Sequence, residues 1–152
     1  MQDDHVTGGD SEHRVAGLFA QTVPEIAAGT VTIQAVARKP GVRTKIAVAS
    51  ADPAIDAVEA CVGPEARRVR AVVSALDGER IDIVPWAVAP ERRIRYALAP
   101  LPVLRIELET ALHRARVWAR EDDVAKFGEE HRDLASRLSG WDLELEVSPP
   151  AA

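Results

Sequence analysis

The chain has 152 residues, of which 47% are hydrophobic and only 4% are aromatic, so its core must be built mainly from aliphatic side chains. Its net charge of −5 is the sum of −3 over residues 1–11, zero over residues 12–87 and −2 over residues 88–152, which excludes the strongly basic balance of a tight nucleic-acid binder. No apolar run reaches the ~18 residues of a membrane span, and the acidic start is unlike a signal peptide. Because a single cysteine forms no internal disulfide, we expect a cytoplasmic protein without membrane contact.

The first elements predicted along the chain are a helix and a hairpin of two strands. Residues 1–11 should be a disordered acidic tail. A helix comes next and should end near Gly29, because apolar residues recur there at helical spacing. Strands over residues 30–39 and 43–50 are joined by a turn at Pro40-Gly41. The inward residues of the helix and the first strand should be Val15, Leu18, Phe19 and Val23, and Val31, Ile33, Ala35 and Ala37.

Two helices and a third strand come next. Residues 51–63 read as a loop and a short helix, and residues 65–76 as a longer helix that stops at Gly78. The third strand begins near residue 80, and Pro85 marks its end or an edge of the sheet. The longer helix and this strand should bury Val69, Val72, Val73 and Leu76, and Ile81 and Ile83.

The second half of the chain repeats the same order of elements. A helix starts at Pro90, two strands cover residues 103–110 and 113–120, helices cover 122–128 and 129–140, and a last strand covers 141–147. We therefore predict an α+β fold with two six-element domains, each with a three-stranded sheet packed on its helices. The domains should span residues 12–87 and 88–147, and residues 148–152 should form a tail.

Helix-strand-strand-helix-helix-strand, with a glycine-bearing turn between the central helices, resembles the type II KH domain. The stretches "VPEIAAGTV", "ARKPGVRTKIAV" and "GERIDIVPW" closely resemble the tandem KH region of the NusA family of transcription elongation factors. The resemblance is strong from about Leu18 to Pro100, weakens through residues 101–130 and returns around residues 134–146. It implies two tandem type II KH domains that bind single-stranded RNA in transcription elongation, termination or antitermination.

The resemblance also implies where RNA would bind. Family members grip phosphate with a Gly-x-x-Gly loop and a helix N-terminus, and the glycines let backbone N–H groups come close. The first loop here is Gly63-Pro64-Glu65-Ala66, which lacks the second glycine and carries an acid where a basic residue is common. The second has Gly128 followed by Glu129 and Glu130, in a segment about one helical turn shorter than the family's. We expect a weakened clamp in the first domain and none in the second.

Basic residues on the predicted helix and around the hairpin turn are the remaining candidates for RNA contact. The predicted helix carries three arginines, and the hairpin turn is flanked by four more cations. Ordinary solvated charges would look the same in the sequence, and that alternative stays open. The candidate RNA-binding residues, with the loop positions Gly63 and Pro64, are Arg67, Arg68 and Arg70, and Arg38, Lys39, Arg43 and Lys45.

Other chemistry-bearing residues favour structural roles. Cys61 has no activating histidine near it and should be a core residue. No histidine or cysteine spacing suits a metal, His113 should lie at a turn between strands, and His131 is surrounded by charged neighbours. The acids 121–123 suit a helix N-terminus, and Trp86 and Trp141 should pack rather than stack on bases. We expect no enzyme activity, cofactor or metal.

Two functions from different classes therefore remain. The first is RNA binding linked to transcription, carried mostly by the first domain. The alternative is a KH pair that has lost RNA binding and docks a protein such as RNA polymerase or a transcription factor. The acidic second domain favours the alternative, and a titration with RNA at two salt concentrations distinguishes the two.

Overall fold

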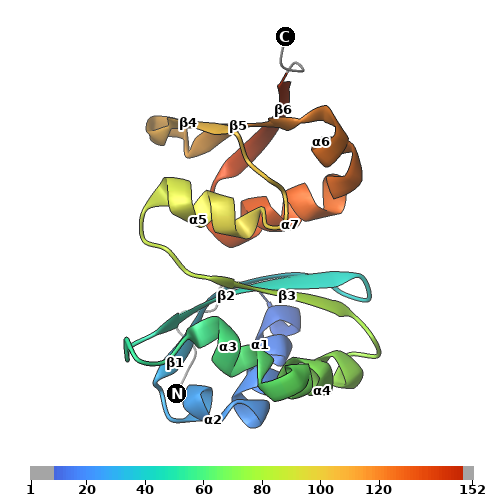
Figure 1. Cartoon of the computed structure of the whole chain (residues 1–152). Helices are drawn as coiled ribbons and strands as arrows, with labels where there is room; N and C mark the ends of the chain where they lie inside the picture. The colour runs from blue at the N-terminus through green and yellow to red at the C-terminus, as the bar shows by residue number, and fades with distance from the viewer. Residues whose placement is uncertain (1–8, 149–152) are drawn as a thin grey trace. The chain divides into compact units, whose positions relative to one another are not determined.

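A computed structural model describes residues 9–148 of the chain, and Figure 1 shows its elements. The chain divides into two compact units between Trp86 and Ala87, one residue before the boundary expected from the sequence. Most of the two predicted tails, residues 1–8 and 149–152, lie outside the described residues. Of the described residues assigned to these tails, Asp10 and Ser11 belong to the first helix and Ser148 to the last strand.

The first unit contains eight elements. In chain order they are α1 (Asp10–Thr22), α2 (Pro24–Ala27), β1 (Val31–Lys39), β2 (Arg43–Ser50), α3 (Ala57–Val62), the 3-10 turn η1 (Pro64–Ala66), α4 (Arg67–Ala75) and β3 (Arg80–Pro85). The prediction of one helix as far as Gly29 is wrong. Val23 is extended (φ −109°, ψ 107°) and separates two helices, because the ring of the following proline disfavours helical backbone at the residue before it.

The sheet of the first unit has the order β1-β2-β3, with β1 antiparallel and β3 parallel to β2. Helices α1, α3 and α4 pack on one face, and their apolar side chains form the core with those of the strands. The four residues predicted to face inward along β1 are all buried, but after a β-bulge at Gln34 it is Val36, and not Ala35 or Ala37, that joins Val31 and Ile33 in the core cluster packed with the helices. The bulge adds one residue and so reverses which face the later side chains meet.

The second unit repeats this topology. Its elements are α5 (Pro90–Ala97), β4 (Arg105–Glu109), the 3-10 turn η2 (Thr110–Leu112), β5 (Arg114–Arg120), α6 (Glu121–Phe127), α7 (Glu129–Ser139) and β6 (Asp142–Ser148). The sheet order is β4-β5-β6, again with one antiparallel and one parallel pair. The prediction of an α+β chain with two three-stranded sheets packed on helices, as in tandem type II KH domains, is therefore confirmed.

Candidate nucleic-acid interface

The turn between α3 and α4 depends on a glycine. Gly63 ends α3 with φ 77° and ψ 167°, and its N–H donates to the Glu59 carbonyl at 2.8 Å. A Cβ added to Gly63 would lie 2.6 Å from Cγ of Arg68. Both the positive φ and the close approach of Arg68 therefore favour glycine at this position.

The rest of this loop uses most of its own hydrogen-bond donors. Pro64 has no N–H, the Ala66 N–H donates to the Gly63 carbonyl at 3.0 Å, and the Arg67 N–H donates to the Pro64 carbonyl. Glu65 and Ala66 both adopt left-handed backbone, with φ 56° and 60°. Ala66 thus keeps the conformation that the missing glycine would favour, at a cost of about 1 kcal/mol for its Cβ. Within the loop, the N–H of Glu65 is the donor left for a phosphate.

The three arginines of α4 have three different environments. Arg67 is exposed and pairs with the Glu65 carboxylate at 2.9 Å, so a loop acid neutralises it. Arg68 is partly buried and donates to Glu25 at 2.8 Å and to the Ala60 carbonyl at 2.7 Å, which ties α4 to α2 and α3. Arg70 is exposed, and the described residues offer it no recorded partner. Arg67 and Arg70 remain accessible to a ligand, whereas Arg68 has a structural role.

The apolar face expected for α4 is narrower than the sequence indicates. Val72 and Leu76 are buried, whereas Val69 is partly buried against the core and Val73 is only partly buried. The arginines still lie outside this face, as the spacing predicts.

Three of the four hairpin cations, Arg38, Arg43 and Lys45, are engaged in ion pairs within the first unit. Arg38 is 8% exposed and Lys45 is fully buried. Arg43 and Lys45 both pair with Asp82, at 2.7 and 3.5 Å. Burial lowers the pKa of Lys45, and the opposing charge of Asp82 offsets part of this effect. Lys39 alone of the four is exposed without a recorded partner among the described residues.

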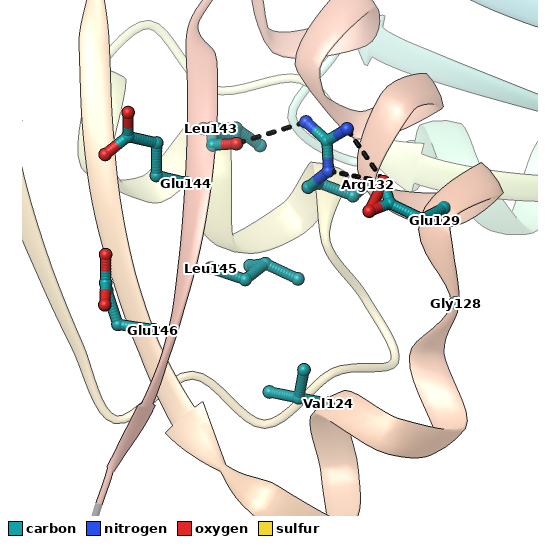
Figure 2. A pocket seen from close by; sticks show the side chains of 8 residues that line it. All are labelled: Val124, Gly128, Glu129, Arg132, Leu143, Glu144, Leu145 and Glu146. Atoms are coloured by element: carbon teal, nitrogen blue, oxygen red, sulfur yellow. Dashed lines mark hydrogen bonds and ion pairs between the residues drawn. The ribbon is translucent and has the colours of Figure 1, made fainter.

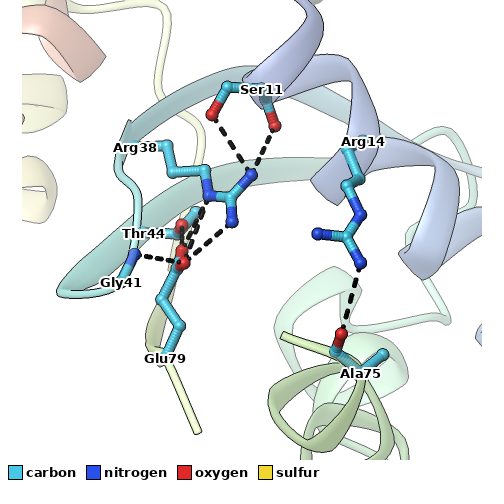
Figure 3. A network of polar contacts seen from close by, with 7 residues as sticks. All are labelled: Ser11, Arg14, Arg38, Gly41, Thr44, Ala75 and Glu79. Carbon is cyan, nitrogen blue, oxygen red and sulfur yellow. Dashed lines mark hydrogen bonds and ion pairs between the residues drawn. The ribbon is translucent and has the colours of Figure 1, made fainter. Parts of the chain in front are cut away.

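Figure 3 shows the network that holds Arg38, and Glu79 is its centre. The Arg38 guanidinium donates to both Glu79 oxygens at 2.9 Å and to the Ser11 carbonyl at 3.0 Å. The Gly41 N–H donates to Glu79 at 2.9 Å, and the Thr44 hydroxyl donates to it as well. This cluster fastens the start of α1, the hairpin turn and β3 to one another.

Glu79 was not among the residues that the sequence singled out. Its carboxylate is almost completely buried. Burial by itself would raise the pKa of Glu79, but the hydrogen bonds from Arg38, Thr44 and the Gly41 N–H outweigh it and lower the pKa below its usual value. The only signal in the sequence is an acid next to the Gly78 turn, which gives no indication of its partners.

The second unit has the same glycine but not the same loop. Gly128 follows α6 with φ 84° and ψ 157°, close to the values at Gly63, and α7 starts at the next residue. The turn η1 therefore has no counterpart, and the exposed acids Glu129 and Glu130 form the first turn of α7. This turn offers no basic residue and no loop of N–H groups to a phosphate, because the acids stand directly at the helix N-terminus.

A groove of about 590 Å³ lies between this turn and β6 (Figure 2). Val124, Leu143 and Leu145 give it an apolar floor, and Glu129 and Arg132 lie at its rim. Arg132 donates to Glu129 at 2.8 Å and to the Leu143 carbonyl at 3.4 Å, so this cation is held within the unit.

A comparable hollow of about 580 Å³ flanks the loop of the first unit. Glu25, Asp56 and Glu59 contribute carboxylates to it, and Arg68 is the cation among its lining residues. The side of the loop next to α3 is therefore acidic, and the basic side is the outer face of α4.

The remaining candidates have structural roles. Cys61 is completely buried, and burial, with the nearby Glu25 charge, raises the pKa of its thiol to about 11, so it is no nucleophile at neutral pH. His113 lies at the predicted turn and its ring lies 4.9 Å from that of the buried Trp141. His131 stacks on Phe127. The acids 121–123 form the first turn of α6 as expected, and Trp86 is partly exposed at the end of the first unit.

Within residues 9–148 no group of three or more histidine, cysteine or acidic side chains is placed to hold a metal ion. No helix in that part of the chain is both long and apolar enough to cross a membrane.

Comparison with known proteins places this geometry in context. Residues 10–86 match the family described as NusA-like first KH domain. The chain is 42% identical over 132 residues to the transcription termination/antitermination protein NusA of Thermus thermophilus, and 39% identical over 138 residues to that of Bacillus subtilis. These matches cover 85% and 88% of the chain but only 34% and 37% of the relatives, so the chain spans about a third of their length.

The match extends over both units in further relatives. NusA of Mycobacterium tuberculosis is 40% identical over 141 residues, which is 90% of this chain and 40% of that protein. A solved structure, that of APE1850, superposes with a TM-score of 0.63 over 91% of this chain and 100% of its own, at 18% sequence identity. At that identity the likeness concerns the fold alone.

Proposed function

We propose, from the premise that this chain belongs to the NusA-like KH family, that it binds single-stranded RNA weakly through its first unit. The site would be the Gly63–Ala66 loop together with the outer face of α4. The supporting observation is the left-handed backbone kept at Glu65 and Ala66, in a loop that leads into the N-terminus of α4 and its exposed Arg67 and Arg70.

The clamp in this proposal is weaker than a Gly-x-x-Gly loop with a basic residue. Glu65 repels phosphate and pairs with Arg67, and the Ala66 side chain occupies space that a glycine would leave to the ligand. Replacing a basic residue by an acid changes two charges, which is worth about 1–2 kcal/mol at an exposed site. Lys39 would add a further phosphate contact, and the second unit would contribute none through its turn.

The biological setting is inferred from the relatives. They are transcription termination/antitermination proteins, and we propose a cytoplasmic role in transcription elongation or termination, with nascent RNA as ligand and RNA polymerase or a transcription factor as a further partner. We propose no enzymatic reaction and no cofactor.

The test is an anisotropy titration of a labelled 12-nucleotide oligouridylate at 50 and 200 mM salt. Because phosphate contacts are salt-sensitive and independent of base, the double variant R67A/R70A should weaken binding to every RNA sequence alike and reduce the salt slope by about one to two units. The matched control R92A/R120A removes two exposed arginines of the second unit and should leave binding unchanged.

Two results would contradict the proposal. One is the absence of RNA binding by the unaltered chain at 50 mM salt. The other is an equal loss of affinity in the variant and in its control, which would mean that only total charge matters. A large loss of folding stability in R67A/R70A would show that these side chains are not on the exposed face of α4, since exposed arginines contribute little to stability.

A further inference from the structure

The outer edge of β6 carries unused backbone groups. The Asp142 N–H donates to the His113 carbonyl at 2.8 Å, so Asp142, Glu144 and Glu146 direct their N–H and C=O groups toward β5. Leu143, Leu145 and Val147 alternate with them and direct theirs away from the sheet.

Among these outward residues, Leu143 is the one whose backbone N–H and carbonyl have hydrogen-bond partners within the described residues. The Leu143 N–H donates to the Ser136 hydroxyl at 3.2 Å, and the Leu143 carbonyl accepts from Arg132 at 3.4 Å. The described residues supply no recorded partner for the outward groups of Leu145 and Val147. From Leu145 onward β6 is therefore an open edge of the kind that pairs with another strand.

The equivalent edge of the first unit is closed by a proline. The N–H groups of Arg80 and Trp86 donate to β2, at the carbonyls of Val42 and Val48, so Ile81, Ile83 and Pro85 are the outward residues of β3. Pro85 is the sixth residue of β3 in the register with β2, and Val147 is the sixth residue of β6 in the register with β5. Pro85 has no N–H to offer, whereas Val147 has one and is 48% exposed.

The groove beside this open edge has the composition of a peptide site. The side chain of Leu145 points toward Val124 across an apolar floor (Figure 2). Glu129 and Arg132 are the charged side chains on the groove side of β6, and the side chains of Glu144 and Glu146 lie on its other side (Figure 2). Glu144 and Glu146 approach an arginine of β5 at 3.9–4.0 Å, which is too long for a hydrogen bond and leaves them able to receive another cation.

The same features disfavour nucleic acid in this groove. Carboxylates would face a phosphate backbone, and the Gly128 turn has no loop of N–H groups to compensate for them. An extended peptide, by contrast, presents donors and acceptors in the alternation that Leu145 and Val147 offer.

We propose that β6 of the second unit docks an extended peptide rich in lysine or arginine, which adds to the sheet as a fourth strand. An apolar side chain of the peptide enters the groove between Val124 and Leu145, and its cations, which alternate to the other face, meet Glu144 and Glu146. The proposal goes beyond RNA binding and is independent of it, because it uses no residue of the first unit.

The experiment titrates the whole chain with a labelled ten-residue peptide of alternating valine and lysine. The variant V147P copies the proline that closes β3 and removes the outward N–H, so the affinity should fall by about tenfold. The matched variant V147A keeps the N–H and should stay within about twofold of the unaltered chain. A peptide with glutamate in place of lysine should bind at least about tenfold more weakly, and the 12-nucleotide oligouridylate should not compete.

A second measurement keeps the proposal testable if V147P fails to fold. Methylating alternate backbone nitrogens of the lysine peptide removes its own donors, and this should abolish binding to the unaltered chain. Bound peptide should also slow hydrogen exchange at the Leu145 and Val147 amides. Equal affinity of V147P and V147A, binding of the methylated peptide, or displacement of the lysine peptide by oligouridylate would each overturn the proposal, the last in favour of an RNA groove.

Discussion

The two units share a topology and a left-handed glycine between their central helices, but they differ in the residues that come directly after that glycine. The first unit places Pro64, Glu65 and Ala66 between Gly63 and α4, whereas the second starts α7 directly after Gly128. Both units keep a glycine with positive φ at this turn, and only the first places further residues between the glycine and the next helix. Two units of one topology can therefore present different backbone donors at the same turn.

The units also differ in how they use charge. The first buries an ion pair, Arg38 with Glu79, inside a hydrogen-bonded cluster. In the second unit the arginines Arg114 and Arg116 approach the acids of β6 at 3.9–4.0 Å, all at exposed or half-exposed positions. Buried pairs are costly to break and exposed pairs contribute little, so stability should respond very differently to matched substitutions.

The largest effect is expected from E79A. Removing this carboxylate leaves the buried Arg38 uncompensated and the Gly41 N–H without its acceptor, which should cost about 3–5 kcal/mol of unfolding free energy. The control E144A removes an exposed partner in the second unit and should cost less than about 1 kcal/mol. Urea denaturation followed by Trp fluorescence measures both, and similar losses in the two variants would refute the contrast.

The same carboxylate should make the first unit sensitive to acid. The pKa of Glu79 is lowered in the folded state, so its contribution to stability is present above the ordinary pKa of 4.5 and is lost as the pH falls through the lower folded value. The urea midpoint of the unaltered chain should drop below pH 4.5. E79Q has no carboxylate to protonate, so its midpoint should depend less steeply on pH, and parallel profiles for the two proteins would contradict the assignment.

Alanine substitutions at Gly63 and Gly128 should destabilise the two units by different amounts. Each site combines a positive φ with a ψ of about 160°, a region that costs a non-glycine residue about 1–3 kcal/mol. At Gly63 a Cβ also meets Arg68 and would displace it from Glu25, whereas at Gly128 the nearest atom is a Glu130 oxygen at 3.8 Å. Thermal denaturation should therefore show a larger loss for G63A than for G128A, and the reverse order would show that Arg68 moves aside without cost.

The smallest expected change tests whether the first loop is a latent clamp. E65K/A66G removes the repulsive acid and the Ala66 Cβ, and should raise affinity for oligouridylate by about tenfold at low salt. E129K/E130K changes charges in the second unit without restoring a loop, so it should raise affinity less. Unchanged affinity in E65K/A66G would mean that the first loop is no RNA site.

Much of the fold was predictable because it rests on local patterns. Helical spacing of apolar residues located α1 and α4, and glycines at Gly63, Gly78 and Gly140 marked helix ends. Two features of the fold were not predicted from these local patterns. The proline after Val23 splits the first helix, and the bulge at Gln34 changes which residues of β1 face the core. A bulge leaves no mark in a sequence that is apolar on both sides of it.

The candidate site was predicted less completely. The sequence located Gly63, the acidic loop position and the poor second loop, because these are statements about residue types at a turn. It grouped Arg38, Lys45, Arg68 and Arg70 as equivalent cations, which they are not. Arg38 and Lys45 are buried, Arg68 forms an ion pair with Glu25, and Arg70 is exposed.

By itself the sequence determined the repeated six-element order, the glycine at each central turn and the placement of acids after it. These depend on the conformational range of single residues and on spacings of a few positions. Only the tertiary structure decided that Glu79 meets Arg38, forty-one positions away, and that the edge of β6 is open where β3 ends in proline. Ion pairing, burial and strand exposure are set by which distant segments the fold brings together, and a one-dimensional pattern does not contain that information.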